Sequence, residues 1–427
     1  MFGGIHNMKM TKTTLTIISL LLLCTTVINL AGCSIKVQAA DLMAGITPNS
    51  VSALEGLSES NADVTDFAIR LFKQSNEDGK NTLISPLSVL CALSMTANGA
   101  NGETREQMED VLGMTADELN LYLYSYLSSL PQGEKYKLSV ANSIWFRDDE
   151  RLSVKQDFLQ TNADYYGASI YKAPFNGQTL RDINNWVKSA TDDMIPNILD
   201  KIPGDAVMYL INALAFEAEW TEIYEKGQVR DGKFTTEDGT KQKVEFMYSS
   251  EGKYLEDENA TGFIKYYSGK KYAFAALLPN EGISVSEYLA TLDGASVADM
   301  LSNAKNATVN TAIPKFETEY DVEMSDILKA MGMTDAFNGS LADFSSLGTS
   351  SDGNIYIGRV IHKTYIQVGE KGTKAGAATA VEMNDESAYV TEGEIKQVYL
   401  DRPFVYMLID CENNIPFFIG TAMDIKK

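Results

Sequence analysis

The sequence predicts an α+β fold built on largely antiparallel sheets. Helical periodicity is concentrated early in the chain and strand-like segments late, without the regular alternation of strand and helix that parallel sheets require. Hydrophobic residues make up 44% of the 427 residues and charged residues 22%, which is typical of a globular protein. No Pro- or Gly-rich linker divides residues 61–427, so we expect a single large domain there.

The N-terminus is predicted to be a targeting segment. Lys9 and Lys12 precede an apolar run, Leu15 to Leu30, that is short and polar for a membrane span. The run ends in Leu30-Ala31-Gly32-Cys33, which resembles the lipobox of bacterial lipoproteins. This resemblance implies that residues 1–32 are a signal peptide and that Cys33 carries a lipid anchor. The alternative is an ordinary secretory signal cleaved after Ala39, and both readings predict export from the cytoplasm.

Residues 33–60 are small and polar, and we expect them to form a flexible tether between the anchor and the domain. Removal of residues 1–32 takes away two lysines and no acid, which changes the net charge from −22 to −24. Such a charge repels nucleic acid and anionic lipid, so contact with a membrane is expected only through Cys33.

Three helices have clear signals. Residues 62–74 place Val64, Phe67 and Leu71 on one apolar face. A second helix is expected after Ser85, which is a natural N-cap, and is expected to stop at Gly99. A third is predicted for residues 182–195.

Strands dominate the rest of the chain. Two pairs are expected to form hairpins, one across Ser268-Gly269 and one across Glu412-Asn413-Asn414. The strand candidates are residues 137–146, 207–216, 262–267, 272–278, 308–316, 361–369, 398–408 and 417–423.

Enzymatic chemistry has little support. The chain has no nucleophile elbow, P-loop, dinucleotide motif or paired-cysteine metal spacing, and we expect neither a metal nor a cofactor. His6 lies in the removable segment, so His362 remains alone, and its apolar flanks favour a hydrogen-bonded core residue over a catalyst. The 58 acids leave a glycosidase-type carboxylate pair open on counts alone, although an acidic surface accounts for them. We expect Cys91 and Cys411 to be two separate buried thiols, and a disulfide is the alternative.

The run from Glu370 to Met383 fits no ordinary element. Its centre is rich in Ala and Gly, and a long run of small residues between apolar strands is typical of a protease-sensitive loop. If it were extended, Thr373 and every second residue up to Met383 would share one face. The segment is therefore either a plain flexible loop or a loop that becomes a half-buried strand in a second state.

This run resembles the hinge of the serpins, a family of serine protease inhibitors. The resemblance extends over about residues 61–427, and several further motifs in the right order carry it. These motifs are Asn81–Ser88, Ala141–Trp145, Ile183–Val187, Asn212–Phe216 and Leu400–Phe404.

The resemblance implies a serpin fold with three mostly antiparallel β-sheets, about nine helices and an exposed reactive-centre loop at about residues 370–397. It also implies an irreversible suicide-substrate inhibitor of extracellular serine proteases, which traps the acyl-enzyme by inserting the cleaved loop into the main sheet. Insertion of Gly372–Glu386 would lay down roughly 50 Å of strand. The new ladder would release on the order of 10 kcal/mol. The alternative is a non-inhibitory serpin that acts as a binding or storage lipoprotein on the surface.

The resemblance also assigns site residues. Trp220 marks the breach, where the hinge enters the sheet, and Ser85, Ser88, Asn212 and His362 form the shutter, a buried polar cluster where central strands part. The hinge residues are Glu370, Gly372, Thr373, Ala375, Gly376, Ala377, Ala378 and Thr379.

The reactive bond follows from the usual spacing, seventeen residues from Glu370, which gives Glu386-Ser387. Ala388, Tyr389 and Val390 are the alternatives, because the stretch up to Leu400 is longer than is common in the family. Glutamate would suit a Glu-specific protease, and Ala or Val an elastase-like or subtilisin-like one. Residues 115–130 contain no Lys or Arg, so heparin is not an expected partner, and we expect a monomer.

Overall fold

A computed structural model of the chain describes residues 37–149, 152–202, 208–351, 353–373 and 395–426. Residues Gln38–Lys427 form one compact unit. Its described part contains nine α-helices and three β-sheets of seven, nine and two strands. The predicted α+β class is therefore confirmed.

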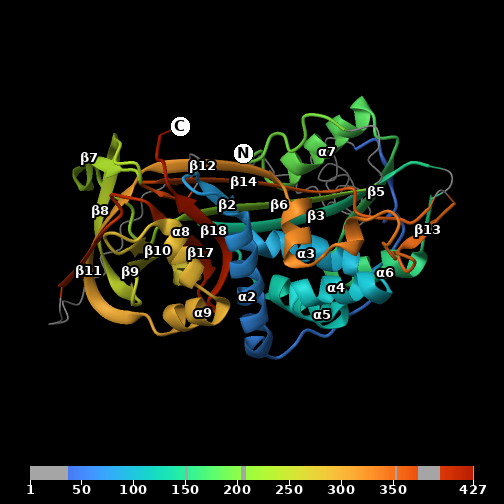
Figure 1. Ribbon diagram of the computed structural model, residues 1–427, viewed down its shortest axis with the longest axis horizontal. Coiled ribbons are helices and arrows are strands. Elements are labelled where there is room, and N and C mark those ends of the chain that lie inside the picture. Colours follow the sequence, from blue (N-terminus) through green and yellow to red (C-terminus); the bar gives the residue numbers. More distant parts are fainter. Residues whose placement is uncertain (1–36, 150–151, 203–207, 352, 374–394, 427) are drawn as a thin grey trace, which may run out of the picture. The chain divides into compact units, whose positions relative to one another are not determined.

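The seven-stranded sheet is the main sheet. Helices α3 to α6 lie on one of its faces and α7 lies on the other (Figure 1). Most neighbours are antiparallel, but β3–β5 and β6–β14 are parallel. The strand order is β1 (Ala40–Asp41), β5 (Ser169–Ala173), β3 (Tyr136–Arg147), β6 (Met208–Glu219), β15 (Gly372–Thr373), β14 (Arg359–Gly369) and β12 (Phe316–Glu323).

The nine-stranded sheet contains most of the C-terminal half of the chain. Both predicted hairpins are present in it, because β9 pairs with β10 and β17 pairs with β18. The two-stranded sheet joins β13 (Gly348–Ser350) to β4 (Leu152–Val154). The order in the large sheet is β16 (Ile395–Tyr399), β11 (Lys305–Pro314), β8 (Lys241–Glu256), β9 (Ala260–Tyr266), β10 (Tyr272–Pro279), β17 (Phe404–Asp410), β18 (Ile415–Ala422) and β2 (Thr82–Ile84), with β7 (Val229–Thr235) also paired to β8.

Helix α3 carries the best-defined sequence signal. All its residues, Pro86–Ala97, are buried, and the Ser85 hydroxyl caps the helix by accepting a hydrogen bond from the Ser88 N–H. It ends two residues before Gly99. The other helices are α2 (Ser58–Ser75), α4 (Gly102–Leu112), α5 (Ala116–Ser129), α6 (Gln156–Tyr166), α7 (Gly177–Ala190), α8 (Val285–Thr291), α9 (Gly294–Ser302) and α10 (Ser325–Met331).

For three predicted elements, the structure gives the reason why the bounds differ. The helix predicted for residues 182–195 is α7, which starts earlier because the Asn176 side chain accepts from two N–H groups of its first turn. The strand predicted for residues 308–316 breaks after Pro314, which has no N–H for a ladder. The strand predicted for residues 398–408 is split between β16 and β17 by Asp401-Arg402-Pro403.

The segment predicted to be a flexible tether, residues 33–60, makes contacts with the domain where it is described. Strand β1 pairs with β5 at the edge of the main sheet, and helix α2 already begins at Ser58. The N–H groups of Gln38 and Ala39 donate to one oxygen of Asp182, a carboxylate that is only 2% exposed. Further along, the Asn49 N–H donates to Asp164. This segment is fixed along its length by side chains that lie more than a hundred residues away in sequence.

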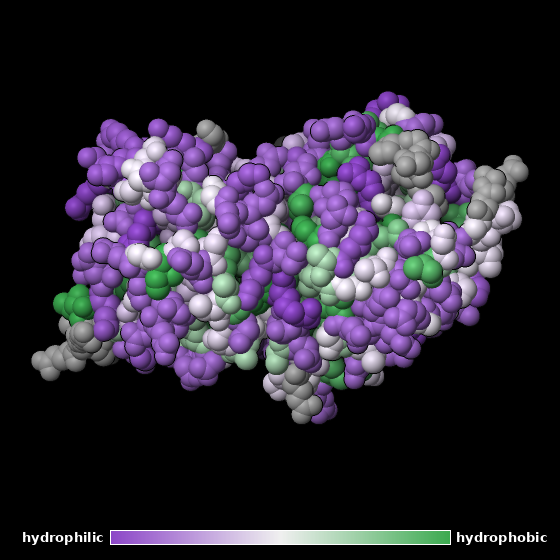
Figure 2. Space-filling model, viewed as in Figure 1, coloured by the Kyte–Doolittle hydropathy of each residue, from purple (hydrophilic) through white to green (hydrophobic). Residues whose placement is uncertain are grey.

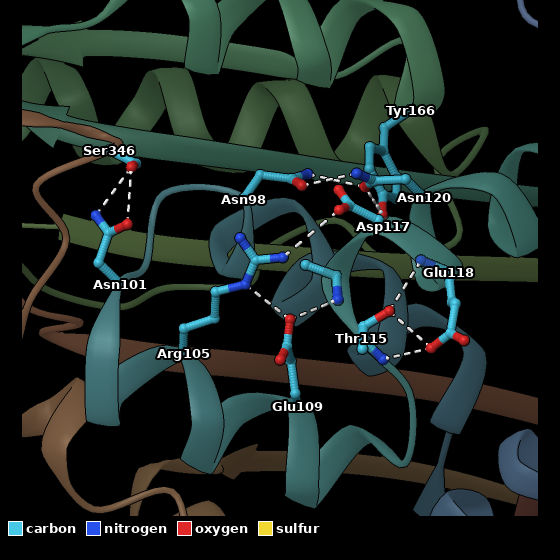
Figure 3. A network of polar contacts seen from close by, with 11 residues as sticks. Asn98, Asn101, Arg105, Glu109, Thr115, Asp117, Glu118, Asn120, Tyr166 and Ser346 are labelled. Carbon is cyan, nitrogen blue, oxygen red and sulfur yellow. Dashed lines mark hydrogen bonds and ion pairs between the residues drawn. The ribbon is translucent and has the colours of Figure 1, made fainter.

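A polar network joins the ends of helices α3, α4, α5 and α6 (Figure 3). The Asn98 and Asn120 amides donate to each other at 2.9 and 2.8 Å, and the Tyr166 hydroxyl donates to the Asn120 oxygen at 2.7 Å. Thr115 and Glu118 form a capping box at the start of α5. Because these groups satisfy one another, the network holds the helices in place beneath the main sheet and leaves little polar capacity for a ligand.

The face of the molecule shown in Figure 2 is mostly hydrophilic. On this face, hydrophobic residues form small separate patches. No helix in the described parts of the chain is long and apolar enough to cross a membrane.

Candidate functional site

The centre of the main sheet contains two parallel strands that are joined at one end only. Arg359–Lys363 of β14 pair with Tyr209–Ala213 of β6. Beyond this stretch, no pairing between residues 364–367 and 214–217 exists among the described strands. The far end of the opening is occupied by the two-residue strand β15, which is antiparallel to both neighbours. The sheet is thus already parted where a further strand would enter.

Strand β15 fits this position closely. A Cβ atom on Gly372 would lie 1.9 Å from the Ala218 carbonyl oxygen, so only glycine can occupy this place. Thr373 is 1% exposed, and its hydroxyl contacts the Tyr267 hydroxyl in the core beneath the sheet. The hinge predicted from sequence therefore begins as a seated strand at Gly372 and Thr373.

The chain just before β15 is held by Trp220 and its neighbours. The Trp220 ring stacks on the Tyr267 ring at 4.3 Å between centroids, and its Nε1 donates to the Gly369 oxygen at 2.9 Å. The Trp220 N–H donates to the Lys371 oxygen at 2.8 Å. The structure therefore places Trp220, the predicted breach residue, directly against the hinge.

Glu370 faces the opposite way, toward the start of β12. Lys315 Nζ lies 2.7 Å from a Glu370 oxygen and 3.0 Å from one of Glu245. Partial burial would raise the pKa of Glu370, but the hydrogen bond and charge of Lys315 outweigh it and hold that pKa below its usual value. Both side chains are about one-third exposed, so we expect this pair to contribute under about 1 kcal/mol to stability.

The four predicted shutter residues lie together where β6 and β14 are still paired. All four are buried, and His362 is directly opposite Asn212 in the register. The Ser88 hydroxyl donates to the Asn212 side-chain oxygen at 3.1 Å. The Ser85 N–H donates to His362 Nε2 at 3.0 Å, and His362 Nδ1 lies 2.5 Å from that Asn212 oxygen.

These contacts define the protonation of His362. Because Nε2 accepts from the Ser85 N–H, the ring proton must be on Nδ1, where it is donated to Asn212. Burial lowers the pKa of His362 to about 3, so the ring is neutral at physiological pH. The prediction that His362 is a hydrogen-bonded core residue is confirmed.

Several predicted residues lie outside the described parts of the chain. They are Cys33, the hinge residues Ala375, Gly376, Ala377, Ala378 and Thr379, and the reactive-bond candidates Glu386, Ser387, Ala388, Tyr389 and Val390. The loop predicted for about residues 370–397 is shorter at its end, since Ile395 already belongs to β16. Cys91 and Cys411 are free thiols, of which Cys91 is buried and Cys411 half-buried. Within the described parts, no group of three or more His, Cys, Asp or Glu side chains could hold a metal ion.

The sequence reasoning missed three residues of this site: Tyr267, Lys315 and Lys265. Tyr267 was placed at the end of a predicted strand, and nothing local indicates that it contacts the hinge. Lys315 and Lys265 are ordinary charged residues in sequence, and their roles depend on partners from other strands. Only the three-dimensional pairing of distant strands reveals them.

The main sheet thus has two central strands that pair at one end only, with the short strand β15 seated between them at the other end. Residues 62–425 match the family described as "Serpin (serine protease inhibitor)". The chain belongs to the serpin family. The predicted serpin fold is thereby confirmed.

Relatives and solved structures agree with this assignment. A serpin-like protein of Thermococcus kodakarensis is 30% identical over 370 residues, which is 85% of each chain. The leukocyte elastase inhibitor of Equus caballus is 30% identical over 345 residues, covering 77% of this chain and 89% of that protein. The crystal structure of the thermophilic serpin tengpin in its native state superposes with a TM-score of 0.86 at 50% identity, covering 91% of this chain and all of the other. Members of this family are generally protease inhibitors rather than enzymes.

Proposed function

We propose that this chain is an irreversible suicide-substrate inhibitor of extracellular serine proteases. The observation that carries the proposal is the seat of Gly372 and Thr373 between β6 and β14, ahead of residues small enough to follow them into the sheet. The protease serine attacks the carbonyl of the reactive bond, the amine of the next residue leaves, and an ester joins the protease to the new C-terminus. Insertion of the loop then carries that ester away from the solvent and catalytic groups that would hydrolyse it.

The register of β15 supports a path for the proposed insertion. Thr373 lies opposite Ala218, and each further loop residue would meet the preceding residue of β6. Residue 383 would then lie opposite Met208, the first residue of β6. Because the Thr373 side chain points into the core, every second residue from Ala375 to Met383 would follow it inward.

This register supports a reactive bond beyond residue 383. Glu386-Ser387 meets that condition, and so do the alternatives at Ala388, Tyr389 and Val390. Insertion also replaces one parallel contact by two antiparallel ones, which are somewhat more stable per residue. A ladder of this length would contribute on the order of 10 kcal/mol, enough to pull apart the oxyanion site of an attached protease.

The target class follows from the residues around the reactive bond. Glu382, Asp385 and Glu386 make this stretch acidic, which favours a Glu-specific protease over a trypsin-like one. Ala388 and Val390 favour an elastase-like or subtilisin-like enzyme, and one relative of this chain bears the name leukocyte elastase inhibitor. Helix α5 presents Asp117 and Glu118 and no basic residue, so heparin would be repelled, and we expect the inhibitor to act as a monomer.

A panel of Glu-specific, elastase-like and subtilisin-like proteases tests this function. We expect at least one protease to give a complex that survives boiling in detergent. We also expect a released C-terminal peptide, and its mass should show that it begins at Ser387. The catalytic-serine variant of the same protease is the control and should give no such complex. Cleavage by every protease without any complex, and without a rise in thermal stability, would instead support a non-inhibitory binding or storage role.

We also propose that the chain is exported and anchored through a lipid on Cys33. Cleavage after Ala39 would remove Gln38 and Ala39, whose N–H groups donate to the buried Asp182 carboxylate. Cleavage before Cys33 leaves both donors in place. In a bacterial host, we expect Cys33→Ala to move the protein from the membrane to the soluble fraction. Equal membrane recovery of the variant and the unchanged chain would contradict the anchor.

A further inference from the structure

Lys265 is a buried cation beside the hinge. It lies in β9 with 2% of its surface exposed, although lysine is almost never buried without a partner. Its Nζ atom donates to a Glu251 oxygen on β8 at 2.8 Å. The same atom lies 4.5 Å from the centroid of the Tyr224 ring and 5.4 Å from that of Trp220. The ammonium is thus held between one carboxylate and two aromatic rings.

This group stays charged in the folded protein. Burial alone would lower the pKa of Lys265, but the Glu251 carboxylate outweighs burial, and the pKa lies above its usual value. A permanent charge in this position orients the rings around it more strongly than an apolar side chain would.

Lys265, Glu251, Trp220 and Tyr224 together form what we call the Lys265 cluster. On one side, this cluster holds the chain that enters the reactive loop. Trp220 binds the carbonyls of Gly369 and Lys371 through its two N–H groups. The Tyr224 N–H donates to the carbonyl between them, that of Glu370, at 2.9 Å. The three consecutive carbonyls of residues 369–371, just before β15, therefore depend on the two residues whose rings lie against Lys265.

On its other side, the cluster reaches the chain that leaves the loop. The Ser249 hydroxyl lies 2.6 Å from the Glu251 oxygen that binds Lys265, and 2.9 Å from the Thr311 hydroxyl. Thr311 belongs to β11 and lies opposite Val398 of β16, the strand in which the described chain resumes after the loop. Through these neighbours, the buried ion pair of Lys265 and Glu251 connects the chain that enters the loop with the chain that leaves it.

From these contacts we infer that Lys265, paired with Glu251, is a positioning residue for strand insertion. The inference rests on the proposed function, in which the acyl-enzyme either hydrolyses or is trapped by insertion. During insertion the loop turns at Gly369–Lys371, which precede the inserted strand. Trp220 and Tyr224 hold this segment in place, and the Lys265 ammonium holds their rings. Loss of the charge loosens this segment, slows insertion relative to hydrolysis, and releases more cleaved chain.

Two variants separate positioning from simple stability. Lys265→Met keeps the length of the side chain but leaves the Glu251 carboxylate without its partner, so it is expected to lower stability as well as trapping. Lys265→Met with Glu251→Gln removes both charges and is expected to recover most of the thermal stability. We expect both variants to release about tenfold more cleaved chain per complex than the unchanged protein.

A matched control is the exposed pair of Lys305 and Glu256, which joins β11 to β8 away from the hinge. Lys305→Met should leave the ratio of released to trapped inhibitor unchanged. If the double variant recovers both its stability and its trapping, Lys265 has a structural role only and the inference is wrong. An unchanged ratio in Lys265→Met would overturn it as well.

The outcome is distinguishable from a failure of the proposed function. If the unchanged protein forms no complex with any protease, that function fails by itself. The inference is then tested on the cleaved chain, by following the appearance of the thermally stable form after cleavage within residues 374–394. A slower appearance in the double variant than in the Lys305→Met control supports the positioning role, and equal rates exclude it.

Discussion

Under the proposed function, Thr373→Arg is expected to convert the protein from an inhibitor into a substrate. Thr373 is 1% exposed, and its side chain points into the core beside Tyr267. An arginine there would have to bury its charge without a partner or leave the sheet, and either outcome costs several kcal/mol. The first step of insertion would then be blocked, while the reactive bond remains as accessible as before. Proteases should therefore cleave the variant and hydrolyse the acyl-enzyme normally.

The measurement is the fraction of protease that becomes covalently bound, read on a denaturing gel. We expect the complex to fall to a trace in Thr373→Arg and the cleaved chain to show no gain in thermal stability. Gln367→Arg is a matched control, because Gln367 is exposed on the neighbouring strand β14 and should tolerate the same charge. Complex formation by Thr373→Arg at the level of the unchanged protein would refute insertion as the trapping step.

The central elements of the fold and site could be predicted from sequence because their signals are local. Ser85 and Pro86 define the start of α3 through capping, which acts within one turn. Gly372 could be assigned to the hinge from the run of small residues that follows it, although the close approach to Ala218 that requires a glycine is visible only in the structure. His362 could be placed in the core because it lies in a strand-like run, with Val360 and Ile361 before it and Tyr365 and Ile366 shortly after it.

The features that sequence reasoning missed depend on distant partners. Residues 38–57 have the composition of a tether, yet Asp182 and β5 fix their backbone through contacts that leave no pattern in the segment itself. Lys265 is a single charged residue in an otherwise apolar strand, and only its contact with Glu251 on the adjacent strand explains its burial. Backbone hydrogen bonds to remote side chains and buried ion pairs are properties of the assembled fold.

The stability of the native protein is expected to fall as the pH decreases from 7 toward 3, with His362 as a main cause. The pKa of His362 is about 3 in the folded protein and about 6.5 when the ring is exposed. Above pH 6.5 the ring is neutral in both states and contributes no pH dependence. Between pH 6.5 and 3 only the unfolded chain takes up the proton, so the free energy of unfolding falls by about 1.4 kcal/mol per pH unit. Below pH 3 both states are protonated and the loss is complete.

The local structure explains why the folded protein resists this proton. Protonation would occur at Nε2, which accepts a hydrogen bond from the Ser85 N–H. The protonated nitrogen would be a donor that faces another donor, so this hydrogen bond would be lost. The His362 ring contacts Ser85 and Asn212, and in the sheet His362 lies opposite Val322 of β12. None of these three neighbours carries a negative charge that could compensate a protonated ring. Protonation would therefore weaken the seam where β6 and β14 are still paired, which is the same seam that the proposed insertion would open.

His362→Gln isolates this contribution, because glutamine retains a hydrogen-bond acceptor but binds no proton in this range. Urea unfolding of both proteins at pH values from 7 to 4 should show a steep loss for the unchanged protein and a flatter profile for the variant. The comparison is needed because carboxyl groups also titrate in this range. Burial raises the pKa of Asp410 and Asp321, so these groups take up protons more readily in the folded protein and stabilise it as the pH falls. These groups are common to both proteins, so the difference between the two profiles belongs to His362. Parallel profiles would show that His362 does not hold this seam closed by remaining neutral.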